Sequence, residues 1–253
     1  MKISIITVTY NSEQYIEHAL QSVQEQDYPD IEHIVVDGDS KDNTVKVINK
    51  YAANTNRPVK YISEPDKGIY DAMNKGIRMA TGEAIGILNS DDFYAHKEVI
   101  SRVANIYKNE NTQVVIGDIV FVKPTNLNRV VRNYSAKKWH PGKFAWGYMP
   151  AHPSCFIKKK CFEKYGDYKT DYQIAADYEL LIRFLQVHRL PYHYMPEVVV
   201  KMRIGGASTK NWKSNVILNE EIIRGCRENG MPTNRIKVYS KYFKKVFELI
   251  NRG

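Results

Sequence analysis

Two adjacent carboxylates, Asp91 and Asp92, follow the apolar run Ile85–Leu88 after only two intervening residues. A short aliphatic run is typical of a buried strand, and in an open α/β sheet the residues after a strand lie at the ligand crevice. Mg²⁺ and Mn²⁺ prefer oxygen ligands and are held by one or two carboxylates together with water and substrate phosphates. The pair therefore predicts a divalent cation site, although Asp is also a preferred residue at a helix N-cap.

Four strand patterns, at residues 3–8, 31–36, 59–62 and 85–88, alternate with amphipathic helical patterns. Such repeats predict a parallel sheet with right-handed crossovers. Because the carboxyl ends of parallel strands share one edge, we expect the polar residues after each strand to converge there. These residues are Thr9, Tyr10, Asp37, Asp39, Glu64, Asp66, Asp91 and Asp92.

The chain contains neither G-x-G-x-x-G nor G-x-x-x-x-G-K-[ST], so the sequence supports neither a dinucleotide fold nor a P-loop. Carboxylates can accept hydrogen bonds from a nucleotide base and from ribose hydroxyls, while a cation neutralises a diphosphate. The pattern therefore indicates a nucleotide site without a phosphate loop.

Several ordered motifs together resemble the signature of the family 2 glycosyltransferases. They are Thr9-Tyr10-Asn11, Val36–Ser40 with Asp42 and Thr44, Asp66–Gly76, Ala80–Gly82 and Leu88–Asp92. That family consists of inverting enzymes of the GT-A fold that use nucleotide-diphosphate sugars. The resemblance is dense over residues 1–95 and looser beyond. It implies an α/β, Rossmann-like GT-A fold with a mixed, mostly parallel central sheet and C-terminal helices.

The resemblance also implies roles for individual residues. Asp92 would contact the metal directly, with Asp91 beside it near the ribose, and Asp37 would pair with the base. Gly38 separates Asp37 from Asp39 where many relatives have two adjacent acids, so the division of labour between these acids stays open. The expected donor-binding residues are Thr9, Tyr10, Asp37, Asp39, Glu64, Asp66, Lys67, Gly68, Asp71, Asn74, Asp91 and Arg203, the last in a basic loop suited to a diphosphate.

The second half changes to strand patterns at residues 114–122, 129–134 and 152–157, followed by helices. Asp177 lies in the first turn of an amphipathic helix, where an acid also favours the helix dipole. Its segment resembles the acceptor-activating motif of the family, which implies that Asp177 is the general base. His152, expected at the start of a strand, is a candidate acceptor contact, with a structural role as the alternative.

The expected organisation is a single GT-A domain with a donor-binding half (1–95), an acceptor-binding and catalytic half (96–210) and a helical appendage (211–253). The formal net charge is +9, and from Lys201 onward there are 12 Lys and Arg against 4 Asp and Glu. No nucleic-acid module is recognisable. Residues 236–250 predict a basic amphipathic helix suited to an anionic membrane, with a docked terminal helix as the alternative. Its lysines are Lys237, Lys241, Lys244 and Lys245.

Three cysteines without metal-ligand spacing suit a reducing cytoplasm, and no apolar run approaches the ~18 residues of a membrane span. We therefore expect a cytoplasmic protein, with peripheral attachment to the inner face of the cell membrane as its extension. Residues 186–190 superficially resemble the Gln-x-x-Arg-Trp motif of processive synthases but lack its Trp, which favours single transfers.

The expected function is transfer of one sugar, with Mn²⁺ or Mg²⁺, from a UDP-sugar to a saccharide or lipid-linked acceptor in surface-polysaccharide biosynthesis. Two alternatives remain at this point. One is a catalytically silent nucleotide-sugar-binding protein. The other is a sugar-phosphate nucleotidyltransferase, which would need a Gly-rich, Arg-containing loop where the chain has Thr9–Ser12.

Overall fold

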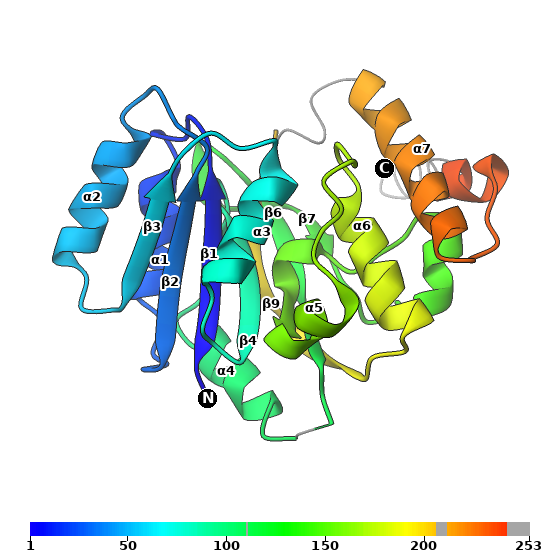
Figure 1. Ribbon diagram of the computed structural model, residues 1–253, viewed down its shortest axis with the longest axis horizontal. Coiled ribbons are helices and arrows are strands. Elements are labelled where there is room, and N and C mark those ends of the chain that lie inside the picture. Colours follow the sequence, from blue (N-terminus) through cyan, green and yellow to red (C-terminus); the bar gives the residue numbers. More distant parts are fainter. Residues whose placement is uncertain (110, 206–211, 242–253) are drawn as a thin grey trace.

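The computed structural model describes residues 1–109, 111–205 and 212–241 (Figure 1). Within them, nine strands form one sheet in the order β3-β2-β1-β4-β8-β6-β9-β5, and β7 pairs with β6. The strands are β1 (Ile3–Thr9), β2 (Ile31–Asp37), β3 (Val59–Ser63), β4 (Ala84–Asn89), β5 (Phe93–Tyr94), β6 (Val114–Lys123), β7 (Asn126–Tyr134), β8 (Cys155–Lys158) and β9 (Tyr192–Arg203). The helices are α1 (Ile16–Gln24), α2 (Thr44–Asn54), α3 (Ile69–Met79), α4 (Val99–Ile106), α5 (Lys159–Tyr165), α6 (Ala176–Leu181) and α7 (Trp212–Glu228). Shorter turns are the 3₁₀ helices η1 (Pro141–Trp146) and η2 (His152–Ser154), and the π-helix η3 (Ile182–Val187) continues α6.

The first four strands of the chain pair in parallel, as their apolar runs predict. In register, Thr9 lies opposite Asp37, and Asp37 lies opposite Ser63. Figure 1 shows the arrowheads of β1, β2 and β3 at the same edge. The four predicted strand ranges are confirmed to within one residue at each end. The loops that follow these strands therefore begin side by side.

The remaining strands make the sheet mixed. β8 runs antiparallel to both β4 and β6, whereas β6 and β9 are parallel. Near the end of β9, Arg203 lies opposite Val122 of β6. The expected mixed and mostly parallel α/β sheet is confirmed.

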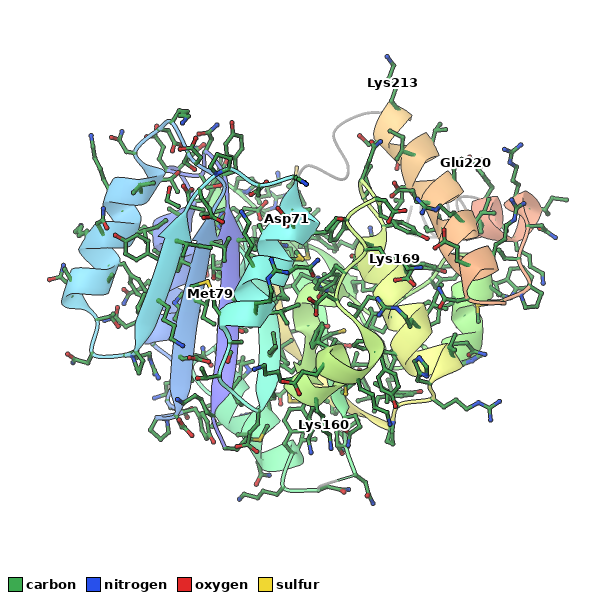
Figure 2. The ribbon with its side chains drawn as sticks, viewed as in Figure 1. Asp71, Met79, Lys160, Lys169, Lys213 and Glu220 are labelled. Atoms are coloured by element: carbon green, nitrogen blue, oxygen red, sulfur yellow. The ribbon has the colours of Figure 1, made fainter. Side chains whose placement is uncertain are left out.

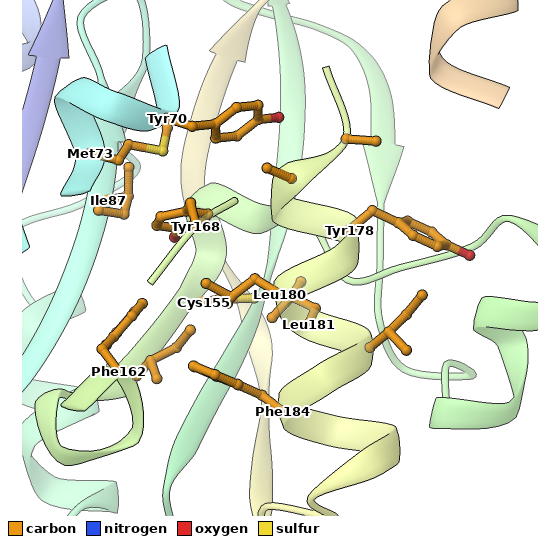
Figure 3. Close-up of a cluster of buried hydrophobic side chains, with 14 of the residues drawn as sticks. Tyr70, Met73, Ile87, Cys155, Phe162, Tyr168, Tyr178, Leu180, Leu181 and Phe184 are labelled. Atoms are coloured by element: carbon orange, nitrogen blue, oxygen red, sulfur yellow. The ribbon is translucent and has the colours of Figure 1, made fainter. Parts of the chain in front are cut away.

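Helices cover both faces of the sheet because alternate residues of the buried strands point in opposite directions. Ile3 and Ile5 of β1 belong to the core cluster that includes residues of α4, whereas Ile6 and Val8 belong to the cluster with α3, α5, α6 and α7. Figure 3 shows aromatic and aliphatic side chains of the latter cluster, among them Tyr168. This face of the sheet therefore joins the two halves of the chain in one core.

A close approach fixes α3 on β1. A Cβ atom at Gly76 of α3 would lie 2.4 Å from Cγ2 of Ile6, closer than packed atoms can come. Glycine at this position lets the helix backbone rest directly on the strand.

Three free cysteines lie in the same core cluster. Cys155 is in β8, Cys161 is in α5 and Cys226 is in α7. Burial raises the pKa of all three thiols, for both Cys161 and Cys226 to about 11. These thiols are therefore protonated at neutral pH.

Two predicted elements differ from the structure. Residues 152–157 do not form one strand, because His152, Pro153 and Ser154 make the turn η2 and β8 begins only at Cys155. Proline fixes φ near −65° and has no N–H, so it suits the start of a helical turn better than a sheet ladder. His152 therefore lies in a 3₁₀ turn and not at the start of a strand. The predicted strand 129–134 is longer and begins at Asn126.

The C-terminal basic helix is described only to Lys241, so residues 242–250 of the prediction lie outside the described residues. Residues 235–241 are helical, with Ile236 83% exposed and Val238 fully buried. Lys241, predicted for the lysine face, is instead 9% exposed and lies against the turn at Gly147. This segment docks on the core because Val238 is apolar and Gly147 leaves room for the lysine stem. No helix of the described ranges is long and apolar enough to cross a membrane.

Candidate active site

The loops after β1, β2 and β3 are bound to one another at the carboxyl edge of the sheet. The amide of Gly38 donates to the carbonyl of Thr9, and the amide of Glu64 donates to the carbonyl of Asp37, both at 3.0 Å. A Cβ atom at Gly38 would lie 2.5 Å from Oδ2 of Asp66 and 3.4 Å from Cδ2 of Tyr10. The expected convergence of these loops is confirmed, with the Tyr10 ring 59% exposed beside the Asp66 carboxylate.

Asp37 and Asp39 lie in different environments. Asp37 is fully buried and accepts hydrogen bonds from the amide and hydroxyl of Ser40 and from Oγ of Ser63. Asp39 adopts a left-handed backbone conformation, with φ of 66°, and its exposed side chain pairs with Lys41 at 2.5 Å. Asp37 therefore organises the loop, while Asp39 is the acid that solvent reaches.

The predicted donor-binding residues at the start of α3 form a compact turn. The amide of Gly68 donates to Oδ1 of Asp66 at 2.8 Å, and the amide of Lys67 donates to Oδ2 of Asp71 at 3.1 Å. Glu64 forms an ion pair of 2.8 Å with Lys75. Figure 2 shows Asp71 on the first turn of α3. Gly68 has φ of 110°, which glycine adopts without strain.

Asn74, also expected at the donor edge, lies inside the protein. Its residue is 5% exposed, its Nδ2 donates to the carbonyl of Tyr168 at 2.8 Å, and its Oδ1 accepts from the amide of Tyr168 at 3.0 Å. The structure therefore uses Asn74 to link α3 to residues 166–175 instead of presenting it to a donor.

Buried side-chain oxygen atoms lie at and just after the ends of β1 and β4. Asp92 is 1% exposed, and its Oδ2 accepts from Nδ2 of Asn89 at 3.2 Å. Within the described part of the chain, Oδ1 of Asp92, Oδ1 of Asn89 and Oγ1 of Thr9 have no hydrogen-bond partner. Burial, and then the neighbouring Asp91, raise the pKa of the Asp92 carboxyl well above its usual range. Leaving buried oxygens unpaired is costly, so this arrangement suits a ligand that accepts their lone pairs.

These atoms fit a hard divalent cation, because oxygen ligands suit Mg²⁺ and Mn²⁺. The described ranges contain no group of three or more His, Cys, Asp or Glu side chains placed to hold a metal ion. A site with one or two carboxylates is the arrangement in which substrate phosphates and water complete the coordination.

Arg203 lies beside the two acids but is 8% exposed. Its guanidinium donates to the carbonyl of Asp91, lies 2.9 Å from Nδ1 of His18, and rests over the rings of Phe93 and Tyr15 at 5.0 and 5.2 Å. Its position thus ties the end of β9 to the acid pair. Residues 206–208 of the expected basic loop lie outside the described ranges.

Asp177 lies in the first turn of α6, as predicted. Its Oδ1 accepts from the amide of Tyr178 at 2.8 Å and lies 3.3 Å from the hydroxyl of Tyr70. The residue keeps some exposed surface, yet burial of the carboxyl raises its pKa, an effect that nearby His152 opposes. Nε2 of His152 lies 2.7 Å from the Tyr168 hydroxyl, and the Tyr168 ring stacks on Tyr70 with centroids 5.8 Å apart. We call Tyr70, His152, Tyr168 and Asp177 the acceptor cluster.

Tyr70 and Tyr168 were not singled out from the sequence. Tyr70 belongs to the Asp66–Gly76 motif and lies four residues before Asn74, so both reach the second half of the chain from the same face of α3. The hydrogen-bond partners of Tyr70, however, are more than 100 positions away. Only the motif itself could have drawn attention to this tyrosine.

Glu179, the next acid after Asp177, has a different environment. Its carboxylate is fully buried and pairs with Arg183 and Lys169, each at 3.1 Å, and it accepts from Asn229 at the same distance. Lys169 is labelled in Figure 2 beside α6. Because all these partners are structural side chains, Glu179 is not available to an acceptor.

The family model described as Glycosyl transferase family 2 matches residues 4–166. The chain belongs to glycosyl transferase family 2. It is 29% identical over 227 residues to a PGL/p-HBAD biosynthesis glycosyltransferase of Mycobacterium tuberculosis, covering 87% of this chain and 82% of the relative. An uncharacterized glycosyltransferase of the same species is 31% identical over 184 residues, with 72% and 68% covered.

Solved glycosyltransferases share the fold of this family 2 member. TarS of Staphylococcus aureus superposes with a TM-score of 0.66 at 21% identity, over 88% of this chain and 40% of TarS. The mannosyltransferase PcManGT of Pyrobaculum calidifontis, in complex with GDP-Man and Mn²⁺, gives 0.64 at 22% identity, over 88% and 64%. At such identities the likeness shows the GT-A fold. Membership of the family decides against a sugar-phosphate nucleotidyltransferase.

Proposed function

We propose that this glycosyltransferase transfers one sugar from a UDP-sugar to a hydroxyl group of a saccharide or lipid-linked acceptor, with inversion, in surface-polysaccharide biosynthesis. The observation that carries the proposal is the position of Asp177. Its carboxylate is oriented by a backbone amide and lies beside Tyr70, which α3 brings from the donor half. A positioned carboxylate at the junction of donor and acceptor halves is what a general base requires.

The proposed donor site is the edge formed by the loops after β1, β2 and β3. The exposed ring of Tyr10 beside Asp66 offers a stacking surface and an acceptor for a nucleotide base, while Asp37 holds the loop in shape. TarS has been solved in complex with UDP-GlcNAc, which supports a UDP-sugar as the first donor to test.

A divalent cation, Mn²⁺ or Mg²⁺, would be held by Asp92 and Asp91. The unpaired oxygens at the ends of β1 and β4 support this assignment, and PcManGT was solved with Mn²⁺. When bound, the cation supplies charge that stabilises the departing diphosphate.

In the proposed reaction, Asp177 accepts the proton of the acceptor hydroxyl. The oxygen of that hydroxyl forms a bond to the anomeric carbon. The bond from that carbon to the diphosphate oxygen breaks with its electron pair, and UDP leaves. One base on the face opposite the leaving group gives a single displacement and hence inversion. The amide of Tyr178 orients the carboxylate, and His152 borders the acceptor.

Hydrolysis of the donor tests this function without knowledge of the acceptor. The full chain is incubated with UDP-GlcNAc or other UDP-sugars and Mn²⁺, and released UDP is measured. We expect slow release that EDTA abolishes. If UDP-sugars stabilise the protein but no UDP is released, the chain is the catalytically silent binding protein. If the affinity for UDP is the same with and without EDTA, the proposed role of the metal is wrong.

A further inference from the structure

Three successive backbone amides just before α6 are bound by one side chain from α7. Oε1 of Glu221 accepts from the amide of Gln173 at 2.7 Å, and Oε2 accepts from the amides of Ile174 and Ala175, each at 2.9 Å. Asp177 follows two residues later. A single carboxylate thus fixes the backbone that leads to the proposed base.

These amides have no local acceptor to serve them. Ala175 occupies the N-cap position of α6, and its methyl side chain cannot accept a hydrogen bond. The first amides of a helix, and those of the loop before it, need acceptors from elsewhere. Glu221 supplies them from a helix that begins some 35 residues further along the chain.

The same segment is held from the opposite side by α3. The Tyr70 hydroxyl donates to the carbonyl of Ile174 and lies 3.3 Å from Asp177. Ile174 is therefore held at both peptide groups: its N–H donates to Glu221 of α7, and its C=O accepts from Tyr70 of α3. With both peptide groups fixed, the position of Asp177 relative to the donor half depends on both helices.

Glu221 itself is carried on a well-anchored helix. Ile222, Ile223 and Cys226 of α7 are buried in the core cluster beneath α6. A Cβ at Gly225 would lie 3.5 Å from Cβ of Glu179, so the two helices pack closely. The carboxylate can therefore hold the loop in one place.

We propose that Glu221 is a positioning residue for glycosyl transfer, which acts through the backbone of residues 173–175 to place Asp177 for catalysis. The inference rests on the proposed role of Asp177 as the base. It also assigns α7 a part in the reaction without contact to substrate.

The test compares Glu221→Gln with Glu220→Gln. Glu220 is the adjacent acid, labelled in Figure 2, and its half-exposed side chain pairs with Arg235 at 3.1 Å, away from the loop. A glutamine at position 221 keeps one acceptor oxygen but turns an NH₂ group toward the amides. Hydrolysis of UDP-GlcNAc with Mn²⁺ gives kcat and KM for each variant, and thermal unfolding reports folding.

We expect Glu221→Gln to lower kcat by about tenfold or more with KM for the donor changed by less than about twofold, while Glu220→Gln matches the wild type. Since Glu221 acts through Asp177, adding Glu221→Gln to Asp177→Asn should lower the rate no further. Three results would each overturn the proposal. They are a wild-type kcat in Glu221→Gln, equal losses of kcat in Glu221→Gln and Glu220→Gln, and additive losses when Glu221→Gln is combined with Asp177→Asn.

If Glu221→Gln does not fold, Glu221→Asp provides the second variant, because it keeps the charge but shortens the reach by one methylene. A lowered kcat with unchanged donor KM supports the proposal, and wild-type kcat overturns it. Failure of the proposed function is seen separately, as wild-type turnover in Asp177→Asn alone.

Discussion

Asp177 and its surroundings combine orientation with a raised proton affinity. The Tyr178 amide fixes one carboxylate oxygen, and burial disfavours the charged form. Such a carboxyl binds a proton more readily than an exposed one, which suits the role that we propose for Asp177, removal of a proton from a weakly acidic hydroxyl.

Asp177→Asn should abolish transfer and donor hydrolysis while leaving UDP binding intact. Asparagine keeps the size of the side chain and its acceptor oxygen for Tyr178, but it cannot take a proton. We expect kcat to fall by roughly a hundredfold to ten-thousandfold, measured as UDP release, with UDP affinity followed by calorimetry. Turnover near the wild-type level would assign the base to another residue.

The pH dependence of kcat follows from the direction of the Asp177 pKa. Burial raises this pKa, and the base works only when ionised, so activity should be present above the raised pKa and be lost as the pH falls through it. Burial also lowers the pKa of His152, so that ring is neutral at pH 7. A profile of donor hydrolysis should show an acidic limb above the ordinary Asp value of about 3.9. Full activity down to that value would contradict the assignment.

Asp92→Asn should stabilise the metal-free protein while removing its response to Mn²⁺. The Asp92 carboxylate is buried next to another acid, and one of its oxygens has no partner in the described structure. Asparagine removes the buried charge and can still accept from Asn89. In EDTA we expect the variant to have a higher Tm than the wild type, by about 2–4 °C for each kcal/mol gained in the free energy of unfolding. Addition of Mn²⁺ and UDP should raise the Tm of the variant no further. A lower Tm in EDTA would show that the acid is satisfied without a cation.

At the scale of elements, α3 links the loops at the carboxyl edge of the sheet to the acceptor cluster. Its first turn lies among the acids of the donor edge, its Tyr70 reaches the acceptor cluster, and its Asn74 holds the backbone of Tyr168. The position of this helix on β1 depends on Gly76.

Gly76→Ala should therefore lower both stability and turnover. Alanine improves helix propensity by ~1 kcal/mol, but overpacking against Ile6 costs ~1–3 kcal/mol and displaces the helix that carries Tyr70. Thermal unfolding and UDP release measure the two effects. Arg78→Ala, at an exposed position of the same helix, is the control and should change neither. A Gly76→Ala protein as active and stable as the wild type would mean that β1 and α3 adjust freely.

The sequence predicted residues 1–95 well because the patterns that mark their strands and loops lie within short segments. Buried strands such as β1 and β2 are short and rich in Ile and Val, and the polar residues after them must meet at one edge. The contact between Tyr70 and Asp177 joins residues 107 positions apart, and the contact between Glu221 and Ala175 joins residues 46 positions apart, so no local pattern marks either Tyr70 or Glu221. His152 was misplaced because Pro153 starts a turn within a strand-like run.

At the scale of the whole molecule, basic residues accumulate toward the C-terminus. The described part of the last helix is docked through Val238, with Lys237 near the partly exposed ring of Trp146 at 5.6 Å and Ile236 exposed. An indole and a lysine side by side suit a membrane interface, so we keep reversible membrane association as a proposal.

Binding to anionic vesicles should weaken as salt is raised, since each lysine near the surface adds ~1 kcal/mol and is screened by ions. Changing Lys237, Lys244 and Lys245 to Gln should reduce co-sedimentation while donor hydrolysis persists. Lys241 is left unchanged because it is buried. No co-sedimentation of the wild type at low salt would leave the helix as an ordinary docked element, with an acceptor that is soluble or presented by a partner.

Labelling of the buried thiols can report local opening of the native protein. Cys226 lies on α7 and Cys155 on β8, and both are shielded and protonated when the protein is folded. Reagents that need an accessible thiolate should react only during opening. The labelling rate of Cys226, compared with that of Cys155, would therefore report how often α7 lifts from the core without unfolding of the sheet.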